Sequence, residues 1–177
     1  MIRTTCFFLT MLLTQHSLAE TFSSHIQTEH GQLAKCSQTQ ISVMTFIDVA
    51  DAALYSSDCA QLPALTADLQ LSFIYHRHIA AEDFIEAAET LLERNLSAAE
   101  FKQIEQELTQ FNMGYESVAE GDRYDIRRNQ DGLSLFKNNR LVSQHTSATL
   151  GQRYYQIWFG DKPFNNKLKQ ALLEPGS

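Results

Sequence analysis

The 177-residue sequence predicts an α+β domain built on an antiparallel sheet. Segments typical of β-strands come first, two amphipathic helical patterns follow, and short strands and further helices close the chain. This order of strands, helices, strands and helices is typical of α+β folds. No repeat or linker interrupts it, so we expect one domain over residues 20–177.

The first 19 residues have the pattern of a secretory signal peptide. Arg3 forms a short, positively charged n-region, and Cys6–Leu13 forms the apolar h-region. Ser17-Leu18-Ala19 has small residues at the two positions that a signal peptidase recognises. The alternative is a buried N-terminal helix. The apolar run is shorter than the roughly 20 residues of a membrane span, and we expect no transmembrane segment elsewhere. We therefore expect cleavage before Glu20 and a periplasmic or secreted protein.

The chain is acidic, with 14 basic and 21 acidic residues. No cluster of lysine and arginine stands out. A nucleic-acid partner is therefore not expected, because such partners need a basic surface.

Two cysteines, Cys36 and Cys59, remain once Cys6 leaves with the signal peptide. An even pair in an oxidising compartment predicts a disulfide. Closing a loop of this length stabilises a fold by about 3 kcal/mol in the chain-entropy model. Two buried free thiols are the alternative, and the lack of a C-x-x-C spacing disfavours a catalytic pair.

The first part of the chain predicts strands. Residues 20–32 are polar and indicate a frayed N-terminus or an edge strand. Residues 34–55 are rich in β-branched and aromatic residues, and their length predicts a hairpin that turns near Ser42 to Thr45. Leu69–Ile79 alternates, with Leu69, Leu71, Phe73 and Tyr75 on one face and Ile74, His76 and His78 on the other.

Two helices are expected next. Residues 80–94 carry Phe84, Ala88 and Leu91 at helical spacing. Ser97 is a suitable N-cap for a second helix that ends near Asn112, and Glu100 completes a capping box.

The C-terminal part predicts three short strands at about 122–127, 133–137 and 140–144, joined by turns at NQDG and KNNR. Helices are expected over 147–159 and 165–173. Between them, Gly160 is expected as a left-handed C′ residue and Pro163 as the start of the last helix, with Trp158 in the core.

Several stretches together resemble the chalcone isomerase-like family. They are VADAALY (49–55), FIYHRHIAAEDFIEAAETLLERN, VAEGDRYDI (118–126), LSLFKNNRLV and the closing pattern IW-x-G-x-x-P with LK-x-x-LL. The resemblance runs from about Leu33 to Leu173 and is greatest to a secreted bacterial branch. It implies a large antiparallel sheet with helices packed on one face, enclosing an apolar cleft. It also implies either chalcone cyclisation, as in plant members, or fatty-acid binding without catalysis.

The catalytic residues of the plant enzymes are not found at the matching positions. Their strand threonine corresponds to Ala50, which can donate no hydrogen bond, and their helix tyrosine falls near Ala81. The strand AKCSQTQIS has no arginine, and its Lys35 lacks the planar fork of a guanidinium. Chalcone isomerisation is therefore not expected.

The polar side chains that remain on the predicted sheet are Tyr55, Tyr75 and Arg77. We predict that they bind a ligand, with Arg77 holding a carboxylate in two hydrogen bonds. The alternative is that Arg77 pairs with Glu82 or Asp83 at a strand end.

Other polar groups are weaker candidates. His76 and His78 form an H-x-H pair that would need a third ligand, such as His145, to hold a metal. Glu120 and Asp122 flank Gly121 in what reads as a solvated turn. No motif for a cofactor or a phosphate is present, so neither a cofactor nor a metal is expected.

The sequence therefore predicts an exported, non-catalytic protein that binds a small apolar or amphipathic ligand such as a fatty acid. Two alternatives stay open. One is an isomerase acting on an enone-type substrate, and the other is a periplasmic interaction protein without a small ligand.

Overall fold

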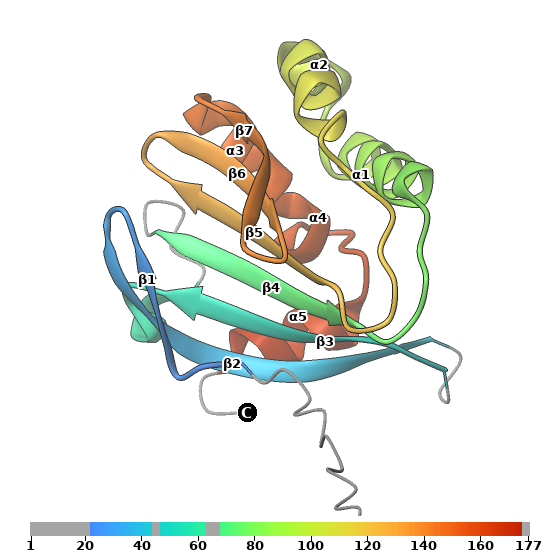
Figure 1. Cartoon of the computed structure of the whole chain (residues 1–177). Helices are drawn as coiled ribbons and strands as arrows, with labels where there is room; N and C mark the ends of the chain where they lie inside the picture. Colours follow the sequence, from blue (N-terminus) through green and yellow to red (C-terminus); the bar gives the residue numbers. More distant parts are fainter. Residues whose placement is uncertain (1–21, 44–46, 63–67, 175–177) are drawn as a thin grey trace, which may run out of the picture.

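One antiparallel sheet, whose strands pair in chain order, forms the frame of the molecule (Figure 1). The computed structural model describes residues 22–43, 47–62 and 68–174. Within them the strands are β1 His25–Thr28, β2 Gly31–Val43, β3 Ile47–Ser56, β4 Leu69–Tyr75, β5 Arg123–Asn129, β6 Gly132–Lys137 and β7 Arg140–His145.

Helices occupy the connection between β4 and β5 and the end of the chain. They are η1 Cys59–Gln61, α1 Ala81–Asn95, α2 Ala98–Asn112, α3 Ala148–Tyr154, α4 Gln156–Phe159 and α5 Asn166–Leu173. The predicted α+β class is confirmed, and so is the capping box, because the Ser97 hydroxyl accepts a hydrogen bond from Glu100 N–H.

The predicted hairpin in residues 34–55 is confirmed, since β2 and β3 pair from Ala34 opposite Ser56 to Val43 opposite Ile47. The predicted turn falls partly on residues 44–46, which lie outside the described residues. β1 pairs with β2 at the sheet edge, so the edge-strand prediction for this region is right.

Alternation along the strands gives the sheet two unlike faces. The first, the helix face, is apolar: Leu69, Leu71, Phe73 and Tyr75 of β4 are buried in the main core. The second, the polar face, consists of Lys35, Tyr55, Gln70, Ser72, Arg123, Asp125 and Arg127. In Figure 1 helices α3, α4 and α5 lie behind the strands, and α1 packs against α3 and α4.

The chain just before β1 crosses the polar face. Lys35 Nζ donates to the carbonyl of Phe22 at 3.1 Å, and the Tyr55 hydroxyl donates to the carbonyl of Ser23 at 2.9 Å. The Arg123 guanidinium lies 5.7 Å from the centre of the Phe22 ring, within cation–π range. This segment therefore shields the charged side chains beneath it.

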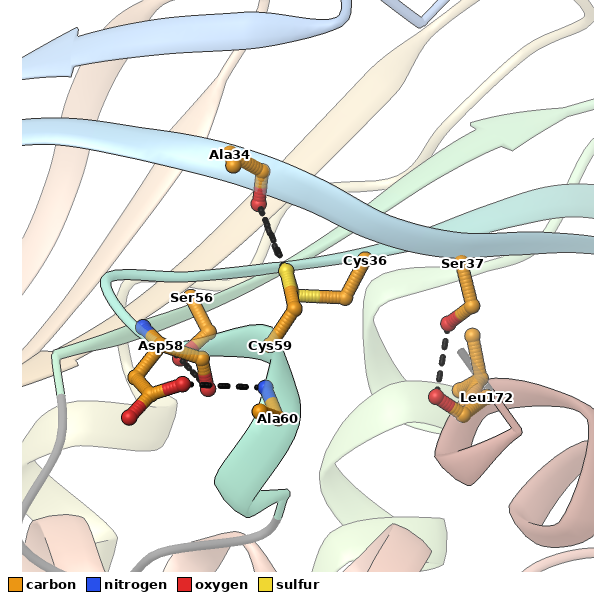
Figure 2. Close-up of a disulfide and its surroundings, with 8 residues drawn as sticks. All are labelled: Ala34, Cys36, Ser37, Ser56, Asp58, Cys59, Ala60 and Leu172. Carbon is orange, nitrogen blue, oxygen red and sulfur yellow. Dashed lines mark hydrogen bonds between the residues drawn. A yellow bond between two sulfur atoms is a disulfide. The ribbon is translucent and has the colours of Figure 1, made fainter. Parts of the chain in front are cut away.

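A disulfide joins Cys36 of β2 to Cys59 of η1, as predicted, with the Cα atoms 5.2 Å apart (Figure 2). Cys36 is the extra residue of a β-bulge, since Lys35 pairs with Tyr55 whereas Ser37 already pairs with Leu54. Beyond the bulge the Ser37 hydroxyl points to α5 and donates to Leu172 O at 2.6 Å. The disulfide thus fixes the strand where its alternation shifts.

The corner around Gly160 differs from its prediction. Gly160 is extended, with φ −68° and ψ 179°, and is not left-handed. A side chain at this position would meet the Asn95 Oδ1 atom at 2.4 Å and the Gln156 carbonyl oxygen at 2.6 Å, so close approach is the reason for the glycine. Pro163 precedes the last helix, which Asn165 caps by accepting from Lys167 N–H and Leu168 N–H.

The single helix predicted over 147–159 is divided at Tyr155 into α3 and α4. The Tyr155 hydroxyl donates to the carbonyls of Leu69 and Ile126 on two adjacent strands. Trp158 in α4 is buried in the core, as predicted. No helix in the described part of the chain is long and apolar enough to cross a membrane.

Candidate functional site

A cavity of about 230 Å³ lies between the helix face of the sheet and helix α1. Its walls are almost wholly apolar and aromatic. They are formed by Ile41, Val49, Ala50, Phe73, Tyr75, Ile79, Asp83, Phe84, Ala87, Ala88, Leu91, Tyr115, Ile126, Tyr154, Ile157, Trp158 and Phe164.

The exposure of the lining residues shows where the cavity opens. Phe73, Tyr154 and Trp158 are buried, whereas Phe164 is 45% exposed and Asp83 is also exposed. The inner end therefore lies against the sheet and α4, and the mouth lies between α1 and the segment before α5.

Hydroxyl groups of tyrosine are the main polar atoms of the inner wall. Tyr115 and Tyr154 form a hydrogen bond of 2.7 Å between their hydroxyls. Tyr75 is 8% exposed, and its hydroxyl makes no hydrogen bond within the described residues. The Tyr75 oxygen is not one of the fully buried atoms that lack a partner, so it is accessible at the cavity and can bond to a ligand there.

These hydroxyls are neutral at physiological pH. Burial raises the pKa of Tyr75 well above 10, and the nearby Tyr115 and Tyr124 add to the shift. Burial likewise raises the pKa values of Tyr115 and Tyr154. Since no phenolate forms near pH 7, these groups can exchange hydrogen bonds with a ligand but cannot act as bases.

The charge at the cavity is negative. Asp83 is the one charged residue among the described residues of the wall. One of its carboxylate oxygens accepts a hydrogen bond of 3.2 Å from Ala80 N–H, which holds it in the first turn of α1. No lysine, arginine or histidine lines the described wall.

The chain matches the family model of chalcone isomerase-like proteins over residues 43–174. The chain belongs to the chalcone isomerase-like family. A solved fatty-acid binding protein of Arabidopsis thaliana is similar in fold, with a TM-score of 0.61 and 13% identity, over 86% of this chain and 91% of that one. No curated protein matches the sequence.

In this chalcone isomerase-like protein, apolar residues occupy the positions that correspond to the catalytic residues of the plant enzymes. Ala50 lies in the cavity wall and is buried. Among the described side chains of the preceding strand β2, Ile41 alone lines the cavity, and Ala81 is not part of the described wall. The cavity thus has no described cation that would hold a phenolate.

The structure does not bring the three predicted ligand-binding residues together. Tyr75 lines the cavity. Tyr55 lies on the polar face, where its hydroxyl is bonded to Ser23. Arg77 is exposed in the bend after β4, outside the described wall, and it makes no ion pair with Glu82 or Asp83.

Among the other polar candidates, His76 and Asp122 have structural partners, whereas His145 Nδ1 is buried without a hydrogen bond in the described residues. His76 Nε2 lies 3.0 Å from a carboxylate oxygen of Asp51. In the described residues, no three or more His, Cys, Asp or Glu side chains are grouped so that they could hold a metal ion. Asp122 accepts from Ala119 N–H and from Asn138 Nδ2, and the latter contact is the main reason that its pKa is lowered.

The sequence did not identify the paired tyrosines, Asp83 or Trp158 as parts of a site. Tyr115 lies in a loop and Tyr154 lies 39 residues later, so only the folded chain joins them. Trp158 was expected to be a core residue, and it is also a wall of the cavity.

Proposed function

We propose that this protein is a non-catalytic binding protein for a small, mainly apolar ligand, held in the cavity between the helix face and α1. The observation that carries the proposal is the apolar cavity itself, with Ala50 where a catalytic hydroxyl would be needed. Enclosing an aliphatic chain there gains about 0.8 kcal/mol per buried CH₂. The fatty-acid binding protein of the same fold supports this class of ligand.

The size of the cavity favours a slender ligand. Its volume of about 230 Å³ is below the roughly 300–1,000 Å³ typical of pockets for drug-sized molecules. A single aliphatic chain suits this shape better than a fused-ring flavonoid. A fatty acid is one such molecule, and a carboxylate contact from Arg77 remains a prediction.

Native mass spectrometry of the purified protein tests the proposal. We expect a reproducible non-covalent adduct with the mass of a small lipid. Ala87→Phe places a ring in the cavity wall and should lower the bound fraction several-fold. Ala99→Phe makes the same change on an exposed position of α2 and serves as the control. Failure of the unmodified protein to retain or take up any lipid would refute the proposal.

We further propose that the protein is exported and that residues 1–19 are removed. The disulfide between Cys36 and Cys59 supports this, because such bonds persist in oxidising compartments. The intact mass of protein recovered from the periplasm should correspond to a chain that begins at Glu20. A chain that retains residue 1 would contradict cleavage.

A further inference from the structure

The charge and hydrogen-bonding groups of the cavity also bear on the head group of its ligand. We propose that the cavity selects a chain with a neutral oxygen head group, such as an alcohol or a ketone, over one with a carboxylate. This rests on the proposed function, since it concerns the ligand of the same cavity.

The first argument concerns charge. A buried carboxylate needs a cation or several hydrogen-bond donors, because its desolvation is otherwise very costly. The charged residue in the described wall, Asp83, is itself an acid and stands near the mouth. An anionic head group would therefore be repelled during entry and find no cation inside.

The residues outside the described ranges are poor in cations. They include a single lysine or arginine, Arg3, which lies in the proposed signal peptide. Arg77, the cation predicted to hold a carboxylate, is exposed and outside the described wall.

The second argument concerns hydrogen bonding. Tyr75 as a residue is more than nine-tenths buried, and its neutral hydroxyl has no hydrogen-bond partner in the described structure. That oxygen is not among the fully buried unpartnered atoms, so a ligand in the cavity can reach it. It can donate one hydrogen bond and accept another. A neutral hydroxyl or carbonyl oxygen would satisfy it without bringing a charge into an apolar wall.

The hydroxyls of the neighbouring tyrosines do not provide a hydrogen-bond partner for the Tyr75 hydroxyl, because they are bonded elsewhere. Tyr115 and Tyr154 are hydrogen-bonded to each other at 2.7 Å. The Tyr124 hydroxyl donates to Glu116 O at 2.6 Å and accepts from Glu116 N–H at 2.8 Å. Tyr75 thus remains the hydroxyl available to a ligand.

The lone tryptophan of the chain provides the readout. Trp158 lines the cavity, so its fluorescence should change when the cavity fills. Titration with 1-decanol and with decanoate at pH 7.5 compares two probes that share a ten-carbon chain. We expect the alcohol to bind at least tenfold more tightly.

Two substitutions identify the cause. Asp83→Asn keeps an acceptor for Ala80 N–H but removes the charge, so the preference for the alcohol should shrink several-fold. Tyr75→Phe removes the hydroxyl, and the affinity for decanol should fall about 2- to 10-fold, as expected for one neutral hydrogen bond. Tyr155→Phe is the control, since Tyr155 is not part of the described wall and its hydroxyl donates to the backbone carbonyls of Leu69 and Ile126.

Decanoate binding as tightly as decanol would overturn the head-group proposal while leaving the proposed function intact. So would a tenfold loss of decanoate affinity in Arg77→Ala, because a cation would then hold the carboxylate. If neither probe changes the fluorescence or forms an adduct in native mass spectra, the proposed function fails, and the head-group proposal fails with it.

Discussion

The two faces of the sheet use the same strands but achieve burial by different means. On the helix face, apolar side chains pack against α1, α3, α4 and α5 and leave a cavity. On the polar face, Arg123 and Asp125 are buried as an ion pair with a 2.8 Å contact, beneath the chain that precedes β1. In this molecule the cavity with apolar walls lies on the face whose covering layer is itself apolar.

Alkaline pH should produce the largest effect, and most of it should come from the helix face. On the polar face burial raises the pKa of one tyrosine, Tyr55, to about 12. Burial raises the pKa values of Tyr75, Tyr115, Tyr154 and Tyr155 on the helix side. The unfolded chain therefore loses these protons first, near pH 10, and stability that is complete below pH 10 falls above it. At pH 11 the loss is on the order of 1 kcal/mol for each tyrosine, or roughly 5 kcal/mol for the four.

Urea unfolding between pH 8 and 11.5 measures this loss, with tyrosinate absorbance followed in parallel. Tyr154→Phe should make the decline shallower by about 1.4 kcal/mol per pH unit above pH 10. A free energy of unfolding that stays level from pH 9 to 11 would show that these tyrosines ionise in the folded protein.

Removing one charge from the polar face should have the next largest effect. Asp125→Ala takes from Arg123 its buried carboxylate partner and should lower the free energy of unfolding by about 3–5 kcal/mol. The double variant Arg123→Met/Asp125→Leu, which makes this part of the face apolar, should regain most of the loss. Chemical denaturation of both variants gives the two values, and equal destabilisation would disprove the role of the isolated charge.

Removing the disulfide tests how much it stabilises β2 at the bulge, where the side chains of the strand change faces. Cys36→Ala/Cys59→Ala should cost about 3 kcal/mol, since the bond closes a loop of 23 residues. Denaturation of the variant and of the reduced parent protein should give similar losses. A much larger loss in the variant would indicate that the buried side chains, and not the bond, stabilise the bulge.

Much of the fold could be predicted because its signals are local. Ser97 and Glu100 mark a helix start, and two asparagines, Asn138 and Asn139, adopt the positive φ values that a tight hairpin turn requires. The prediction of a left-handed Gly160 was wrong because the need for glycine at this position comes from a contact distant in the sequence. The nearby Asn95 side chain comes from another helix, and sequence alone does not show that approach.

The candidate site was less predictable because strand register decides it. Tyr75 lies opposite Ala50, whereas Tyr55 lies opposite Gln70. The two tyrosines therefore project to opposite faces, although both seemed to belong to one ligand-facing set. β4 ends at Tyr75, so the alternation expected to reach Arg77 stops before it. The hydrophobic pattern predicts which side chains form the apolar face, but it does not predict which residues of neighbouring strands pair with each other.

The corner between α4 and α5 is held in place by hydrogen bonds from α1. Asn95 accepts from Lys162 N–H and donates to Lys162 O, and Arg94 donates to the carbonyls of Lys162 and Pro163. These bonds anchor the segment that places Phe164 at the mouth of the cavity. If the cavity holds a ligand as proposed, the rigidity of this corner would bear on the residence time of the ligand more than on its equilibrium affinity.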